Sequence, residues 1–292
     1  MTLKSIIKLF IPPVFYKLKQ ELFSKKRKFI STIHHIHNVK DELVIIGNGP
    51  SLNDTIHYHL TKAEKFDWMV VNNFCNTDLF HQIKPKFYVI ADPSNLRKLE
   101  NLSDLLREET IKFTEGIKSA TWKMSLILPD FAIDGYLVQQ VKLTKNIDIF
   151  YYNTKNFAKN KSKFSDLENN LIAPPAQTVL NTCVYLGLVL NFKKIYIHGM
   201  DMSWHEDLEL DQKTNILYIK DRHFYGTKRR PAILDVNGVK SAKVHEYLMC
   251  SVRALESFWQ LREYADYKKV QIINMSPHSW VDAFDRIEYD KK

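Results

Sequence analysis

The sequence predicts a single α/β domain built on a mostly parallel β-sheet, and two observations lead to this expectation. From about residue 41 onward, short apolar runs typical of buried strands alternate with segments of helical periodicity. This is the pattern of a parallel sheet covered by helices on both faces. The 292 residues, 45% of them hydrophobic, suffice to bury the core of one such domain.

The apolar runs predict seven strands and three long helices. The strands are expected over residues 43–46, 68–71, 87–91, 125–128, 147–151, 195–198 and 270–274. The helices are expected over residues 95–109, 178–190 and 244–267. Residues 202–240 are polar and poorly periodic, so we expect a long loop or lid there.

The net charge of +9 is concentrated in the first 40 residues. That segment holds nine Lys or Arg and one acidic residue, whereas the remaining 252 residues hold 33 basic and 32 acidic groups. The body is therefore nearly neutral, which argues against a nucleic-acid groove. We divide the chain into a basic amphipathic segment (1–40) and an α/β domain (41–292) with its lid at about 202–240.

Residues 1–30 interleave lysines with apolar side chains, and we interpret them as a segment that lies on a membrane surface. Pro12-Pro13 breaks their apolar run, which is shorter than the ~20 residues that a spanning helix needs. The basic run 25–28 would be attracted to an anionic leaflet by about 1 kcal/mol per charge. Packing of this segment on the protein's own body is the alternative.

The three cysteines are too far apart in sequence for a zinc motif and suit a reducing cytosol. We therefore expect a cytoplasmic protein, peripheral on the inner face of the cell membrane. No strong metal signature is present, so no metal site is predicted.

The first predicted strand ends in a glycine turn, Gly47-Asn48-Gly49-Pro50-Ser51. The glycines permit a tight turn, the proline suits the first turn of a helix, and the serine can cap it. A helix N-terminus presented in this way favours an anion such as phosphate. The third glycine of a dinucleotide fingerprint is missing, and a purely structural turn is the alternative.

Polar residues also follow the next strands, where ligands of open α/β sheets collect. Asn72 and Asn73 follow the second strand and offer amides suited to a base, a ribose or a sugar. Asp92 follows the third, and Gly199 and Asp201 follow a later one. Each could instead be a helix cap or a turn residue, but together they predict a shared cleft.

These motifs resemble those of the bacterial CMP-sialic-acid-dependent sialyltransferases of lipooligosaccharide biosynthesis. That family has strands ending in GNGPSL, CNQF and NPS, a helix before IYLSGID, and an ALE helix followed by CPNS. This chain has GNGPSL, VNNF, ADPS, IYIHGMD, ALE and SPHS, in the same order over about residues 42–285. GNGPSL also occurs in a related group that includes pterin pyrophosphokinase-like proteins.

The resemblance implies a modified Rossmann, GT-A-like fold and an inverting transfer from a CMP-activated sugar that needs no metal or other cofactor. Thr178 falls on the family's TSG element, but Val and Leu follow it here in place of the family's Ser and Gly. The identity of the donor sugar is therefore left open. The predicted donor-binding residues are Gly47, Asn48, Gly49, Ser51, Asn72, Asn73, Asp92, Thr178, Gly199, Asp201, Pro277, His278 and Ser279.

The family's general base is a histidine just before the ALE helix, and His245 lies close to that position. Imidazole titrates near neutral pH, as deprotonation of an acceptor hydroxyl requires. An exposed helix residue is the alternative, with His223 as the rival base. The family's lid tyrosines have no aligned pair here, so Tyr218, Arg222 or Tyr225 is predicted to supply the donors that stabilise the departing phosphate.

The leading hypothesis is a membrane-associated glycosyltransferase that acts on an oligosaccharide or lipid-linked glycan. The alternatives are a Mg²⁺-dependent pyrophosphokinase-like enzyme that uses ATP on a small alcohol, and a non-catalytic nucleotide-binding module. The sequence leaves the sugar, the acceptor and homo-oligomerisation open.

Overall fold

The computed structural model describes residues 31–37, 39–154, 163–174, 176–232 and 241–287. They belong to one compact unit, Ser31–Lys292. Residues 1–30 lie outside the described residues, and the predicted membrane segment is therefore not addressed by the fold.

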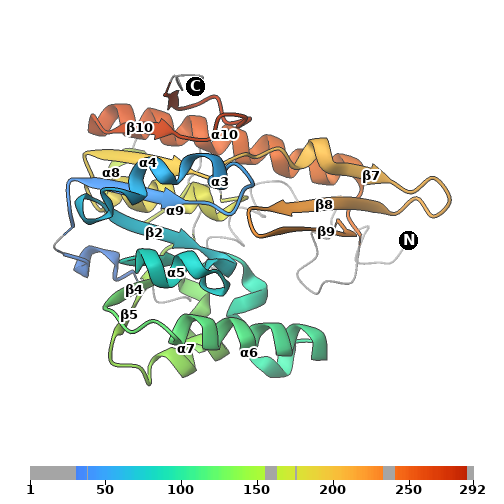
Figure 1. Ribbon diagram of the computed structural model, residues 1–292, viewed down its shortest axis with the longest axis horizontal. Coiled ribbons are helices and arrows are strands. Elements are labelled where there is room, and N and C mark those ends of the chain that lie inside the picture. Colours follow the sequence, from blue (N-terminus) through green and yellow to red (C-terminus); the bar gives the residue numbers. More distant parts are fainter. Residues whose placement is uncertain (1–30, 38, 155–162, 175, 233–240, 288–292) are drawn as a thin grey trace, which may run out of the picture. The chain divides into compact units, whose positions relative to one another are not determined.

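Eight parallel strands form the central sheet, in the order β11-β10-β6-β1-β2-β3-β4-β5 (Figure 1). The strands are β1 (Glu42–Ile46), β2 (Asp67–Val71), β3 (Phe87–Val89), β4 (Met124–Pro129), β5 (Ile147–Tyr152), β6 (Lys194–His198), β10 (Gln271–Asn274) and β11 (Asp285–Arg286). All seven predicted strands are confirmed, with ends shifted by no more than two residues. Within the described central sheet, only the two-residue β11 was not predicted.

The strand order reverses at β1. From β1 the chain adds β2 to β5 on one side, and then returns to place β6 and β10 on the other. In open parallel sheets such a reversal opens a crevice at the carboxyl ends of the strands, and ligands bind there. The predicted polar motifs all follow strands at this edge.

One face of the sheet is covered by α9 (Val179–Val189) and α10 (Val244–Lys268), both close to their predicted bounds. The helix α9 contacts β1, β2 and β3, and α10 packs on α9 and β10. Leu43 and Ile45 of β1 belong to the same core cluster as residues of both helices. Because α9 is apolar on nearly all sides, it is a buried helix rather than an amphipathic one.

The other face carries α3 (Leu52–Thr55), α4 (His57–Leu60) and α5 (Asp78–Ile83). Alternate side chains of the strands point to this layer, because successive residues of a strand face opposite sides. The hydroxyl of Tyr88 in β3 accepts a hydrogen bond from the backbone N–H of Cys75 just before α5. Figure 1 also shows α6 (Asp104–Lys118) and α7 (Tyr136–Val141), which pack on each other, and α8 (Lys163–Glu168).

The predicted helix over residues 95–109 is wrong in its bounds. Two short 3₁₀ turns occupy 93–96 and 99–101, and α6 begins only at Asp104. Leu102 and Ser103 are extended, and Ser103 is the residue before the helix. The regular leucine spacing therefore extends through a turn region that is not helical, and α6 begins where the extended backbone of Ser103 ends.

The segment predicted as a long loop or lid contains a three-stranded antiparallel sheet, which we call the hairpin sheet. It consists of β7 (Leu208–Leu210), β8 (Leu217–His223) and β9 (Gly226–Pro231), and it extends beyond the carboxyl ends of the parallel strands (Figure 1). Its small core is Leu217, Ile219 and Ala232, against which Trp204 and Tyr247 pack. The other side chains of β8 and β9 are polar, which hid these strands from a search for apolar runs.

Beneath the sheet edge, two buried histidines bond to each other. His198 Nε2 lies 2.9 Å from His59 Nδ1, and His198 Nδ1 lies 2.8 Å from Thr55 Oγ1. Burial lowers the pKa of His59 to about 4 and that of His198 to about 3. Both rings are therefore neutral in the folded protein at neutral pH.

These histidines predict that the protein loses stability in mild acid. In the unfolded chain these histidines take up protons near pH 6.5, whereas in the folded protein they do so only near pH 4 or below. Their contribution to the free energy of unfolding is therefore fully present above pH 6.5 and is lost as the pH falls from 6.5 to about 4 and below. The loss approaches about 1.4 kcal/mol per pH unit for each titrating ring. Urea unfolding across this range should show a shallower pH slope for His59→Phe than for the wild type, and equal slopes would contradict the prediction.

Candidate functional site

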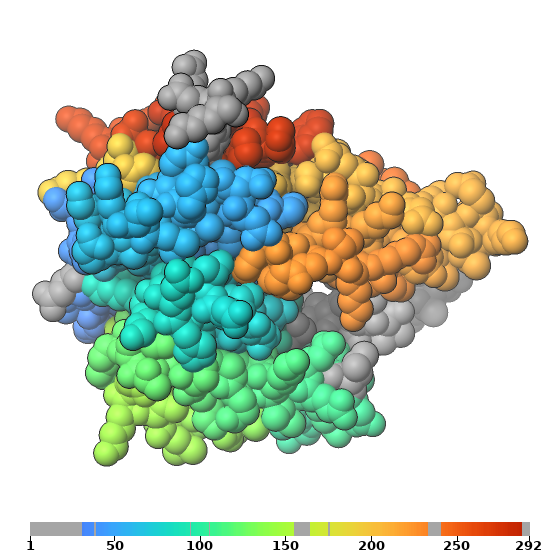
Figure 2. Space-filling view, viewed as in Figure 1, coloured from blue at the N-terminus to red at the C-terminus, as the bar shows by residue number. Residues whose placement is uncertain are grey.

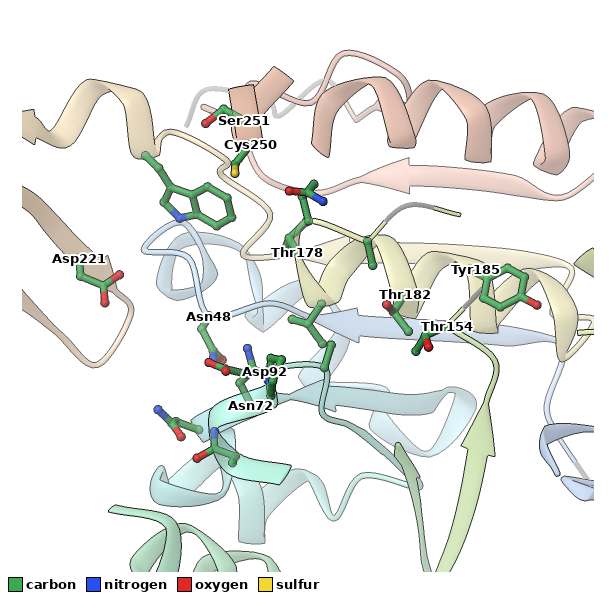
Figure 3. A pocket seen from close by; sticks show the side chains of 18 of the residues that line it. Asn48, Asn72, Asp92, Thr154, Thr178, Thr182, Tyr185, Asp221, Cys250 and Ser251 are labelled. Atoms are coloured by element: carbon green, nitrogen blue, oxygen red, sulfur yellow. The ribbon is translucent and has the colours of Figure 1, made fainter. Parts of the chain in front are cut away.

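A cavity of about 770 Å³ opens at the carboxyl ends of β1 to β5. Its walls come from the loops after these strands, the N-terminus of α9, the hairpin sheet and the first turns of α10. Figure 3 shows labelled side chains from these elements around the cavity. The volume is that of a site for a nucleotide-sized molecule.

The glycine turn after β1 is held against the turn after β6 by a buried carboxylate. Asp201 Oδ2 accepts from Ser51 Oγ at 2.9 Å, and its Oδ1 accepts from the Ser51 N–H at 3.3 Å. A Cβ at Gly49 would overlap this carboxylate. Gly49 donates to the carbonyl of Gly199, which has a left-handed φ of 63° that suits glycine.

This arrangement corrects the predicted role of Ser51. We expected its helix to present an anion site, but α3 is only four residues long and has no side-chain cap. The carboxylate of Asp201 already receives the N–H and hydroxyl of Ser51, so the protein supplies its own anion at this position. Burial raises the pKa of Asp201, although the bonds from Ser51 act in the opposite direction.

Two amide side chains at the ends of β1 and β2 are directed to the cavity, as Figure 3 shows. Oδ1 of Asn48 and Oδ1 of Asn72 are buried, and neither has a hydrogen-bond partner among the residues that the structure describes. Asn72 adopts a left-handed φ of 45°, and its carbonyl accepts from the buried hydroxyl of Tyr88. Since buried acceptors normally have partners, these two oxygens are suited to receive N–H or O–H groups from a ligand.

The N-terminus of α9 faces the same cavity. Thr178 caps it by accepting from the Leu180 N–H at 3.3 Å, and both Gln177 and Thr178 line the wall. Ser251 of α10 lies on the wall as well. It is only 8% exposed, and within the described part of the chain its Oγ has no hydrogen-bond partner. The positive end of an 11-residue helix beside a buried hydroxyl forms a favourable environment for an anion.

The hairpin sheet contributes a charged cluster to the opposite wall. Asp221 Oδ1 lies 3.3 Å from His223 Nε2, and Arg230 Nε donates to Asp221 Oδ2 at 2.8 Å. Burial alone would raise the pKa of Asp221, but the contacts with His223 and Arg230 lower this pKa to about 2. The ring of Tyr225 stacks on His223 at 5.0 Å.

The turn between β8 and β9 is fastened to the parallel sheet. The N–H of Phe224 donates to the carbonyl of Asn48 at 3.0 Å, and Asn53 Nδ2 donates to the carbonyl of Phe224 at 3.0 Å. The Phe224 ring also lies 5.9 Å from that of Phe74. Figure 2 shows this part of the hairpin sheet, in orange, against the blue segment that follows β1.

The structure brings only part of the predicted donor site together. Among the predicted residues, those that line the cavity are Asn48, Asn72, Asn73, Asp92, Thr178 and Tyr225. Gly47, Gly49, Ser51, Gly199 and Asp201 instead build the turns behind it. Pro277, His278 and Ser279 are not among the described lining residues, and Ser279 bonds to the carbonyl of Met200.

Two predicted catalytic residues lie elsewhere. His245 is exposed at the start of α10 and is not among the described residues of the cavity wall, whereas Tyr247, Cys250 and Ser251 of that helix are. Arg222 points away from the cavity and bonds to Asp207 at 2.7 Å. Side chains alternate along β8, so Asp221 and His223 face the cavity while Arg222 cannot.

Sequence reasoning missed Asp221, Arg230, Gln177 and Ser251, and it named His223 only as a rival. The period-two pattern of residues 217–223 was the available signal, because Leu217 and Ile219 share a face with Asp221 and His223. Among the described residues, no three His, Cys, Asp or Glu side chains lie close enough to hold a metal ion. The described carboxylates on the cavity wall are Asp92 and Asp221, and Arg230 and His223 engage the latter.

Comparison with known proteins identifies a family. The model of the family described as 6-hydroxymethylpterin diphosphokinase MptE-like matches residues 17–207, about two thirds of the chain. This is the group that the glycine motif indicated as related, rather than the sialyltransferases themselves. No curated protein matches the chain.

Two solved structures are similar in fold. The MAf glycosyltransferase from Magnetospirillum magneticum AMB-1 is 12% identical, with a TM-score of 0.49 over 89% of this chain and 35% of that one. This chain thus spans about a third of that protein. The α-2,3-sialyltransferase from Campylobacter jejuni is 16% identical, with a TM-score of 0.41 over 85% and 80% of the two chains. Both likenesses are too remote to assign a function.

Proposed function

This chain belongs to the MptE-like family, and we propose that it transfers a sugar from a CMP-activated donor to a hydroxyl of an acceptor glycan. The observation that carries this proposal is the pairing of His223 with Asp221 on one wall of a cavity whose other wall holds the N-terminus of α9. Glycosyl transfer needs both a base for the acceptor and an anion site for the departing phosphate.

His223 is the proposed general base, in place of His245. With Nε2–H donating to Asp221, the lone pair of the ring lies on Nδ1, which takes the proton of the acceptor hydroxyl. The acceptor oxygen forms its bond to the anomeric carbon as the bond from that carbon to the phosphate oxygen breaks. CMP leaves with the electron pair, and attack from the opposite face inverts the anomeric carbon.

The phosphate that leaves would be received by neutral and cationic donors on the cavity wall. Burial raises the pKa of Tyr225 to about 12, so its hydroxyl remains a donor throughout the physiological range. Arg230 takes the role predicted for Arg222, since it lines the cavity. Thr178 and the positive end of the α9 dipole complete the anion site.

The amide oxygens of Asn48 and Asn72 support recognition of the nucleoside. Because these buried acceptors have no partner in the described part of the chain, they suit the exocyclic amine of cytosine or the hydroxyls of ribose. The choice of CMP follows the resemblance to the sialyltransferases, and the sugar it carries is proposed to be sialic acid or a related acid.

A diphosphokinase that uses ATP and Mg²⁺ is the second candidate, because the family's description names that activity. Mg²⁺ between phosphates is held by carboxylates. The described cavity wall offers Asp92 and an Asp221 already engaged by Arg230 and His223, so the residues fit this ion poorly. A binding module without catalysis would keep the cavity yet tolerate loss of His223.

A thermal-shift panel of CMP, CDP, UDP, GDP, ATP and NAD, each with and without EDTA, tests the proposal. CMP at about 100 times its Kd should stabilise the protein by about 2.7 kcal/mol. We expect a CMP shift that EDTA leaves unchanged. A shift seen only with ATP and Mg²⁺ would favour the diphosphokinase.

Substitution of the two histidines separates the rival bases. We expect His223→Ala to lower kcat by about 10²–10⁴-fold in CMP release from CMP-sialic acid with an acceptor, because it removes the base. His245→Ala is the control and should retain wild-type turnover, since this side chain is exposed. The assignment fails if His245→Ala loses activity and His223→Ala does not.

We further propose that residues 1–30 attach the enzyme to the inner membrane surface, where lipid-linked acceptors lie. Among the described residues, no helix is both long and apolar enough to span a bilayer. The basic and apolar residues before position 30 would instead lie at the interface.

Deletion of residues 1–30 should therefore move the protein from the membrane fraction to the supernatant. Transfer to a soluble acceptor should persist, because the cavity is built from residues after 47. Unchanged sedimentation with membranes would refute this role of the segment.

A further inference from the structure

Two half-exposed tryptophans lie in, or are hydrogen-bonded to, the segment that follows β10, and neither takes part in the mechanism above. Trp280 lies in the loop after β10 and Trp259 on α10, and each is 49% exposed. Trp280 Nε1 donates to Glu206 Oε1 at 2.7 Å, and Trp259 Nε1 donates to Asp282 Oδ1 at 3.0 Å. We call Trp259, Trp280, Glu206 and Asp282 the tryptophan platform.

These hydrogen bonds hold the indole rings in fixed orientations at the surface. The ring of His205 also contacts Trp280 edge-on, with centroids 4.2 Å apart and planes at 87°. Exposed aromatic rings that are held in this way lose little further side-chain entropy when a ligand covers them. Glu206 and Asp282 are exposed and keep further acceptor positions beside the rings.

An aromatic face beside carboxylates is complementary to a pyranose. The face of an indole ring is electron-rich, and one face of many pyranoses presents C–H groups of partial positive charge. The hydroxyls at the rim of the same sugar can donate to carboxylate oxygens. A purely apolar partner would instead leave both carboxylates to be desolvated, which is costly.

The platform stands at the same sheet edge as the cavity. Trp204, the first residue of the 3₁₀ turn Trp204–Asp207, lines the cavity, while Glu206 of the same turn belongs to the platform. The N–H of Trp280 donates to the carbonyl of Asp201 at 2.8 Å, directly behind the glycine turn. Arg222, predicted to be catalytic, lies here too, with Nη2 3.9 Å from Glu206 Oε2.

We propose that the tryptophan platform binds pyranose units of the acceptor oligosaccharide that do not react, while the terminal hydroxyl reaches His223. This inference rests on the proposed glycosyl transfer, since it names the acceptor of that reaction. The acceptor class is therefore an oligosaccharide of several units rather than a monosaccharide.

Binding of the full-length protein to an array of neutral and acidic pyranose oligosaccharides, without nucleotide, tests the platform. The best-binding oligosaccharide is then titrated calorimetrically into the variants. Trp280→Ala and Trp259→Ala should each weaken binding about tenfold, whereas Trp280→Phe, which keeps a ring face, should retain most of it. Tyr267→Ala is the matched control, because this aromatic residue is exposed on the same helix and lies outside the platform.

The same variants are also tested for CMP binding by thermal shift, which separates the two proposals. If CMP stabilises the protein but no oligosaccharide binds, only the proposal of the tryptophan platform is overturned. If an oligosaccharide binds but CMP gives no thermal shift, only the proposal of glycosyl transfer is overturned. Equal oligosaccharide affinity in Trp280→Ala and the wild type overturns the platform. The platform is also overturned if the tryptophan variants change their sedimentation coefficient but still bind the sugar. That result would identify the tryptophans as a contact between copies of the chain.

Discussion

The hydrogen bonds between Asp201 and Ser51 are the constraint on which the site depends. They tie the turn after β1 to the turn after β6 at the place where the strand order reverses. The glycines at 49 and 199 are required because the two backbones approach too closely for a side chain. With these turns fixed, Asn48 is presented to the cavity and its carbonyl is available to the hairpin sheet.

The same carboxylate decides where an external anion can bind. Because Asp201 satisfies Ser51 from inside the protein, the first turn of α3 has little attraction for a phosphate. The long, buried helix α9 keeps its N-terminus directed to the cavity, whose wall also holds the buried hydroxyl of Ser251. The glycine motif after β1 thus fixes the shape of the turn in this chain. The electrostatic attraction for an anion comes instead from the N-terminus of α9, more than 120 residues later.

The parallel sheet could be predicted from the sequence because strands buried on both faces, such as 67–71, are apolar at almost every position. The strand-end amides followed from the same logic. The hairpin sheet could not be predicted from apolar runs, since its strands bury only a few residues and are otherwise largely charged. Because side chains alternate along β8, His223 faces the cavity. The position of His245 before the ALE residues suggested it as the base, but it lies exposed at the start of α10.

The hairpin sheet is joined to the parallel sheet at Phe224, and the two parts contribute different groups to the cavity. The parallel sheet supplies the amides and the anion site, while the proposed base and its cation come from two short strands that touch the sheet through few bonds. Evolution can therefore exchange the chemistry of this scaffold by replacing one hairpin, without disturbing the core that keeps the chain folded.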